Sequence, residues 1–167
     1  MAIGAGLPLS YADLSAALGI NWYRGALSAT VSHTNNRYQS VKAATLVDSN
    51  GFTPTWSGDC LTGLSGVFQV SAQLHIPGSA SGQRFVGVAI NPGATTWNSA
   101  TAPAGIVAEP VQDAESDAYV TGVLPAIRIR LTSSDLLMWY GFQDSGSTLT
   151  IPTDATKSWL QIVKVGS

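Results

Sequence analysis

The clearest hydrophobic pattern in the chain runs from Gly66 to Ile76. Apolar residues occupy every second position and uncharged polar residues lie between them: Phe68, Val70, Ala72, Leu74 and Ile76 against Gln69, Ser71, Gln73 and His75. Because successive side chains of a strand point to opposite faces, this spacing predicts a strand at Val67–Ile76 with one buried face. Gly66 precedes the run and Pro77-Gly78 follows it, which favours turns at both ends.

Similar short runs, separated by turn residues, continue from Trp22 to the end of the sequence. They predict further strands at Ala26–Ser32, Tyr38–Leu46, Arg84–Asn91, Tyr119–Leu124, Ala126–Leu131, Asp135–Phe142, Thr148–Ile151 and Trp159–Val165. Asp48-Ser49-Asn50-Gly51 has the composition of a hairpin turn. Many short strands at this spacing are typical of an antiparallel sandwich or barrel. The segment Asn91–Ala118 lacks a strand pattern, and we expect it to pass over the surface.

The strand predicted at Asp135–Phe142 is unusual because both of its faces are apolar. Trp139 falls on one face, and Tyr140 and Phe142 fall on the other. A strand with two apolar faces needs cover on both sides. One side can face the core of the sandwich, and the other can face a neighbouring chain.

Residues 1–22 differ from the rest and form a predicted N-terminal arm, before a head domain at 23–167. Ser10 can cap a short helix, Asp13 lies in the capping-box position, and Gly19 is a natural stop. Two turns of helix are unstable alone in water, so the element must dock on something. It could pack on its own domain or anchor the chain in a larger assembly. The apolar residues available for docking are Leu9, Tyr11, Leu14 and Leu18.

Composition narrows the classes of function. The chain has 167 residues, enough for one domain with a substantial core, but only 11% of them are charged. So few charges indicate that part of the surface is covered, most simply by other copies of the chain. A net charge of −2 and the absence of a basic run argue against nucleic-acid binding. No apolar segment is long enough to span a membrane, and the N-terminus lacks the basic start of a signal peptide.

The residues that usually perform catalysis are sparse. His33 and His75 are the only histidines, and neither has neighbours at a metal-ligand spacing. Gly63–Val67 nearly matches a nucleophile elbow, but the closing glycine is missing. Cys60, the only cysteine, is expected to be a small buried apolar residue. We therefore expect no enzyme activity, no metal and no cofactor.

Two groups of residues could act at the surface. Glu109, Asp113, Glu115 and Asp117 form an acidic cluster that could bind calcium, although a solvated loop fits its spacing better. Trp97 lies in the segment without a strand pattern and is the best candidate for a surface contact. Trp139 and Trp159 are better placed for the core.

Several segments resemble the jelly-roll domains of complement component one q heads and of tumour necrosis factor. The resemblance covers about Tyr23 to Ser167 and rests on the segments Gly66–Ile76, Arg84–Asn91, Asp135–Ile151 and Ser158–Gly166. It implies an all-β, antiparallel jelly-roll sandwich that is trimeric, with aromatic residues of the last strands between subunits. Trp139, Tyr140 and Phe142 stand at those positions. Residues 1–22 contain no collagen-like or coiled-coil segment that would bring three chains together, and no calcium ligands of that family can be assigned here.

Leu7–Gly19 resembles the opening of many tailed-bacteriophage virion proteins. Together the two resemblances imply a non-enzymatic, homotrimeric virion protein, either a surface decoration or a tail-tip component, docked to capsid or tail proteins through residues 1–22. It would be made in the host cytoplasm. One alternative is a receptor-binding tip that recognises host glycan through Trp97. A cell-wall hydrolase is a weaker alternative because it lacks an acid/base pair.

Overall fold

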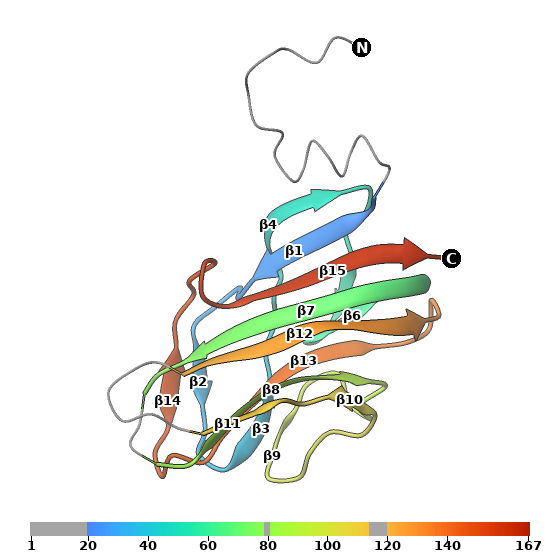
Figure 1. The fold of residues 1–167 in the computed structure, drawn as a ribbon. Coiled ribbons are helices and arrows are strands. Elements are labelled where there is room, and N and C mark those ends of the chain that lie inside the picture. Colours follow the sequence, from blue (N-terminus) through green and yellow to red (C-terminus); the bar gives the residue numbers. More distant parts are fainter. Residues whose placement is uncertain (1–19, 79–80, 114–119) are drawn as a thin grey trace, which may run out of the picture.

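The structure, a computed structural model, describes residues 20–78, 81–113 and 120–167. Within these ranges the chain forms strands and no helix, and the strands pair antiparallel in two layers (Figure 1). No described helix could therefore cross a membrane. The helical arm predicted within residues 1–22 lies almost wholly outside the described residues. The predicted all-β, antiparallel sandwich is confirmed.

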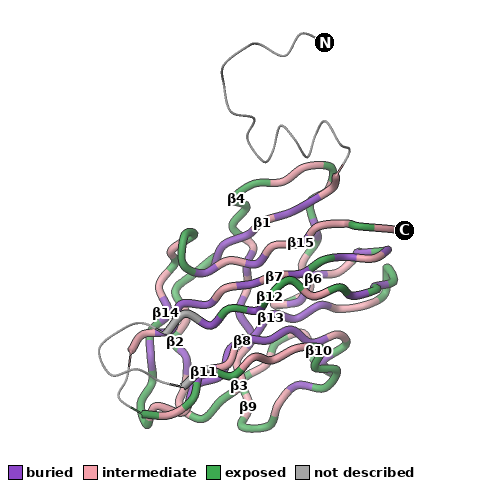
Figure 2. Tube along the Cα trace, viewed as in Figure 1, coloured by how far each residue is buried: buried purple, intermediate pink, exposed green. Residues whose placement is uncertain are grey.

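The first sheet has the strand order β4-β1-β15-β7-β12. In this sheet β7 pairs with β12 on one side and β15 on the other. The amide of Lys164 donates to the carbonyl of Asn21 at 2.8 Å and so joins the start of β1 to β15. β4, at the edge, is largely exposed (Figure 2). The strands are β1 (Trp22–Ala26), β4 (Thr45–Asn50), β7 (Gly66–Ile76), β12 (Val120–Leu131) and β15 (Trp159–Gly166).

The second sheet is built around β13, which pairs with β3 and with β8. β9 extends the β3 edge, β10 and β11 both pair with the far side of β8, and β6 joins β5 to the start of β13. β2 and β14 form a separate pair. The strands are β2 (Val31–His33), β3 (Arg37–Ser40), β5 (Thr55–Ser57), β6 (Cys60–Thr62), β8 (Gln83–Ile90), β9 (Asn98–Ser99), β10 (Ile106–Ala108), β11 (Val111–Asp113), β13 (Leu137–Gln143) and β14 (Leu149–Ile151).

The core lies between the inward rows of β7 and β13. Phe68 is 2% exposed, and the other four apolar residues of its row are fully buried. Trp139 and Leu137 face them from β13. The alternation in Gly66–Ile76 therefore predicted both the strand and its buried face correctly.

β12 is one strand where the sequence predicted two. Leu124 pairs with Ala72 and Ile127 pairs with Val70, so two residues, Pro125 and Ala126, lie opposite one. This is a β-bulge, and it accommodates a proline that cannot donate a ladder hydrogen bond. The break in pattern at Pro125 is a bulge and not a turn.

Other predicted boundaries were wrong. Asp48–Asn50 belong to β4 and pair with β1, so the hairpin turn predicted there is a strand. The strands predicted at Ala26–Ser32 and Tyr38–Leu46 are each divided into two strands with different partners, β1 and β2 in the first case and β3 and β4 in the second. Residues 91–118 contain three short strands that the pattern did not indicate, β9, β10 and β11.

One end of the sandwich contains buried polar side chains. His33, Arg84 and Gln143 are each 0% exposed. Gln143 Nε2 donates to the carbonyls of His33 and Ser147 at 3.0 and 2.8 Å, and Arg84 donates to the carbonyl of Gln83 at 2.8 Å. Burial is the main cause that lowers the pKa of His33, and the charge of Arg84 acts in the same direction. His33 is therefore neutral in the folded protein at pH 7.

This burial predicts that folding stability falls as the pH is lowered from 7.5 to 5.5. Below about pH 6.5 an unfolded histidine takes up a proton, whereas folded His33 does not, so protons favour the unfolded state. The pKa of His75 is also lowered by burial and adds a change of the same sign. Melting temperatures of the wild-type and His33→Gln proteins test this point. Between pH 7.5 and 5.5 we expect the melting temperature to fall less in His33→Gln than in the wild type. An equal fall in both proteins would contradict a neutral, buried His33.

Candidate functional site

The three aromatic residues predicted to lie between subunits are covered within their own subunit. Trp139 is 1% exposed in the core between the sheets. Tyr140 and Phe142 lie on the opposite face of β13 and are 0% and 7% exposed. The described chain itself thus supplies cover for both apolar faces of this strand. Contact of these residues with another subunit stays a prediction.

Tyr140 is held by two features of its surroundings. Its ring crosses Gly87 on β8, where an added Cβ would lie 2.5 Å from the Tyr140 hydroxyl. The hydroxyl donates a hydrogen bond to the Glu109 carboxylate. Burial raises the pKa of Tyr140, and the neighbouring Glu109 raises it further. Glu109, part of the predicted acidic cluster, is thus a partner of a buried tyrosine.

Phe142 belongs to an aromatic row that crosses the outer face of the second sheet. Its ring centroid lies 4.7 Å from that of Tyr38 on β3 and 4.8 Å from that of Phe85 on β8. The row ends at Val111 on β11, which pairs with Phe85 and is 53% exposed. Tyr38 and Phe85 are half-buried, so part of this row faces solvent.

Trp97 is half-buried against the outer face of the same sheet, near Cys60, Met138 and Tyr140. Its indole N–H donates to the carbonyl of Thr101 at 2.9 Å, and its amide donates to the Ser40 hydroxyl at 2.9 Å. The segment that contains it therefore passes over the sheet, as predicted. The role of Trp97 as a surface contact stays a prediction.

The remaining predicted groups show no reactive arrangement among the described residues. Cys60 is fully buried, as predicted, and burial raises its pKa to about 11, with Asp59 adding to the shift. In the described ranges no three His, Cys, Asp or Glu residues gather where they could hold a metal ion. Glu115 and Asp117 of the acidic cluster lie outside those ranges. So do the predicted docking residues Leu9, Tyr11, Leu14 and Leu18.

The outward face of the first sheet has a neutral centre. Charged side chains lie at its sides: Arg128 is exposed on β12, and the Arg24 guanidinium lies 4.7 Å from the centre of the Trp159 ring. Between them, the outward residues of β7 and β15 have no formal charge at pH 7. These residues, called the neutral face below, are Val67, Gln69, Ser71, Gln73, His75, Trp159, Gln161, Val163 and Val165.

A hydroxyl-rich groove lies between the β1–β2 connection and β3. It has a volume of about 390 Å³, and its lining includes Ser28, Thr30 and Ser32. Ser40, also in the lining, donates to the Asp59 carboxylate at 2.6 Å and is bonded to the backbone of Trp97. The groove therefore reaches the residue that sequence analysis selected as a surface contact.

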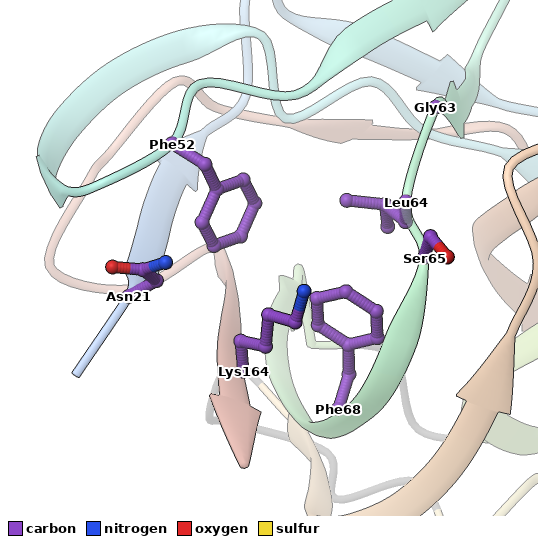
Figure 3. A pocket seen from close by; sticks show the side chains of 7 residues that line it. All are labelled: Asn21, Phe52, Gly63, Leu64, Ser65, Phe68 and Lys164. Carbon is purple, nitrogen blue, oxygen red and sulfur yellow. The ribbon is translucent and has the colours of Figure 1, made fainter. Parts of the chain in front are cut away.

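A second pocket lies at the end of the sandwich where β7 begins and β15 ends (Figure 3). Phe52, Leu64 and Phe68 supply apolar walls, and Lys164 and Asn21 supply polar groups. Sequence analysis did not find it, because its residues come from distant parts of the chain. The available signal was Lys164, a charged residue in the otherwise apolar inward row that begins with Leu160 and Ile162.

No protein-family model and no curated protein matches the chain. Solved structures do match. Murine APRIL at pH 5.0 superposes with a TM-score of 0.64 and 13% identity, over 87% of this chain and 99% of that one. Murine APRIL at pH 8.5 also has a TM-score of 0.64, at 12% identity. The Eiger TNF from S. frugiperda has a TM-score of 0.58 and 13% identity, over 89% and 92% of the two chains.

At such low identity this similarity defines the fold alone. It agrees with the order of strands, in which β7 lies between β12 and β15 in one layer and β13 lies between β8 and β3 in the other. The resemblance to tumour necrosis factor seen in the sequence is therefore confirmed at the level of architecture. The described chain has a tumour necrosis factor-like, antiparallel jelly-roll fold.

Proposed function

We propose that the protein is a non-enzymatic structural component of a tailed-phage virion that assembles as a homotrimer. In this proposal it forms a surface decoration or a tail-tip component, and residues 1–22 dock it to capsid or tail proteins. The fold supports a binding or structural domain. The resemblance of Leu7–Gly19 to the start of phage virion proteins supports the particle assignment.

The neutral face is the observation that best supports self-association. Charged residues are depleted from the centres of protein interfaces, whereas free surfaces are usually rich in charge. Here two adjacent strands present glutamine, serine and valine, and Val165 is 43% exposed. Arginines lie only at the sides. In a closed ring each subunit can use this face and one flank against its two neighbours.

The position where the described chain begins suits a docking arm. The carbonyl of Ile20 accepts a hydrogen bond from Asn50 Nδ2 at 2.7 Å, and the carbonyl of Asn21 accepts one from the Lys164 amide. These bonds fix the chain to the first sheet at one end of the sandwich. In the proposal, the residues before Ile20 dock the protein to the particle.

Charges placed on the neutral face should separate the subunits. We expect light scattering to give a mass of three chains for the wild type and one chain for the Gln69→Lys/Gln161→Lys variant, because a trimer would bring six added charges together. Gln83→Lys on β8 is the matched control, since Gln83 is an exposed strand glutamine away from this face. A wild-type monomer at micromolar concentration would exclude the trimer.

Removal of the arm should abolish docking without unfolding the head. A variant that lacks residues 2–19 keeps the bonds of Ile20 and Asn21, so we expect a folded trimer that no longer joins particles. In the full-length chain, Leu14→Asp should act in the same way, whereas the neighbouring Ser15→Asp serves as the matched control. Particle incorporation can be measured by mass spectrometry of purified particles. Normal incorporation of the truncated protein would disprove the docking role.

The hydroxyl-rich groove favours a second candidate function, a receptor-binding tip that recognises host glycan. Hydroxyl and carboxylate groups in a groove can bond to sugar hydroxyls, and tryptophans can pack against sugar rings. Trp97 lies beside the groove, because its backbone amide is hydrogen-bonded to Ser40 in the groove lining. Trp56 is also near, since the Lys42 ammonium in the groove lining lies 5.7 Å from its ring centre.

In this second candidate, Trp97→Ala and Thr30→Arg should each reduce adsorption of particles to host cells. The first removes the aromatic surface. The second fills the groove from an exposed position without contact to the Trp97 hydrogen bonds. Trp97→Phe should retain most adsorption. Unchanged adsorption in folded Trp97→Ala and Thr30→Arg particles would rule out the glycan role.

A further inference from the structure

The pocket at the end of the sandwich has a mainly apolar interior of about 200 Å³. Phe68 and Leu64 are 2% and 4% exposed. The ring of Phe52 meets that of Phe68 edge-to-face, with centroids 6.2 Å apart. These rings and the leucine leave a space on the scale of one aromatic or branched aliphatic group, well below the usual size of drug-like pockets.

Lys164 is the only charged residue in the lining. It follows Leu160 and Ile162 in the inward row of β15 and pairs with Phe68 across the ladder. Figure 3 shows its side chain beside Phe68, with the nitrogen directed into the space below Phe52 and Leu64. The ammonium therefore lies at the inner side of the sheet, where the sandwich opens.

The ammonium has no carboxylate partner among the residues that the structure describes. The ion pairs found there are Arg84 with Asp144 and Lys157 with Asp154, and neither reaches the pocket. A cation beside apolar walls loses part of its hydration, so an unpaired one favours an anionic ligand. The combination of apolar walls with a single ammonium group defines the ligand that would suit the pocket.

The backbone at Gly66 leaves room for the Lys164 side chain to reach this position. Gly66 has φ +128°, and an added Cβ there would lie 2.8 Å from Lys164 Cε. The start of β7 thus requires glycine at position 66, both for the backbone conformation and to leave room for the Lys164 side chain. The site is already formed without a ligand, which reduces the entropic cost of binding.

We propose that this pocket binds a small carboxylate that has a compact apolar group. The apolar group lies between Phe52, Leu64 and Phe68, and the carboxylate accepts a charge-assisted hydrogen bond from the Lys164 ammonium. The Asn21 side chain lies at the rim, where its amide can donate a second bond. The inference is independent of the proposed trimer and of the virion assignment.

The test uses 3-phenylpropanoate as the probe and its neutral analogue, 3-phenylpropanamide, as the reference. Each is titrated into the full-length protein, and amide NMR shifts of Ser65, Gly66 and Lys164 report binding. We expect saturable binding of the acid with a dissociation constant at least about tenfold lower than that of the amide, as is typical of a hydrogen bond to a charged group. The preference should weaken at high salt.

Three lysine variants assign the preference to one residue. Lys164→Gln should remove the preference for the acid, and Lys157→Gln, at an exposed lysine outside the pocket, should retain it. Lys164→Arg, which keeps the charge, should also retain it and guards against a general loss of structure. Equal binding of acid and amide by the wild type, no saturation, or an unchanged preference in Lys164→Gln would each overturn the proposal.

Discussion

The rest of the structure depends on the inward row of β7. Its apolar side chains are at most 2% exposed, and the strand pairs along most of its length with both β12 and β15. Removal of these side chains from water drives the two layers together, and the ladder satisfies the backbone groups that become buried with them. The outward row of the same strand has no such constraint. Because β7 is paired on both sides, the uncharged composition of this row determines what the outward face of the sheet can contact.

The second sheet differs from the first because its strand β13 is buried on both faces. The core covers Leu137 and Trp139, and the segment after Asn91 returns over Met138 and Tyr140. Glu109, from the same segment, accepts a hydrogen bond from the Tyr140 hydroxyl and so helps to hold the segment on the sheet. Loops of this kind are usual places for recognition, and here the loop has a structural role as well. The two layers thus differ: one leaves an open neutral face, and the other is largely closed by its own chain.

Residue patterns could predict those elements whose periodicity is imposed by one-sided burial. β7 and β15 follow the period of two, and their predicted positions agree closely with the structure. The short strands β5, β6 and β9–β11 have only two or three residues each, so their pairing is decided by distant partners and not by local pattern. The same reason explains why the Lys164 pocket was missed. Phe52, Phe68 and Lys164 become neighbours only when β15 aligns with β7.

The neutral face connects the fold to the proposed assembly. A flat, uncharged surface flanked by arginines can close a threefold ring, and the chain begins its first strand at one end of the same sheet. The most direct measurement is an electron-microscopy map of a phage particle that contains this protein. The account predicts three copies around a threefold axis at the particle surface, with β7 and β15 turned toward neighbouring copies and residue 20 toward the particle. Single copies, or copies with this face open to solvent, would contradict it.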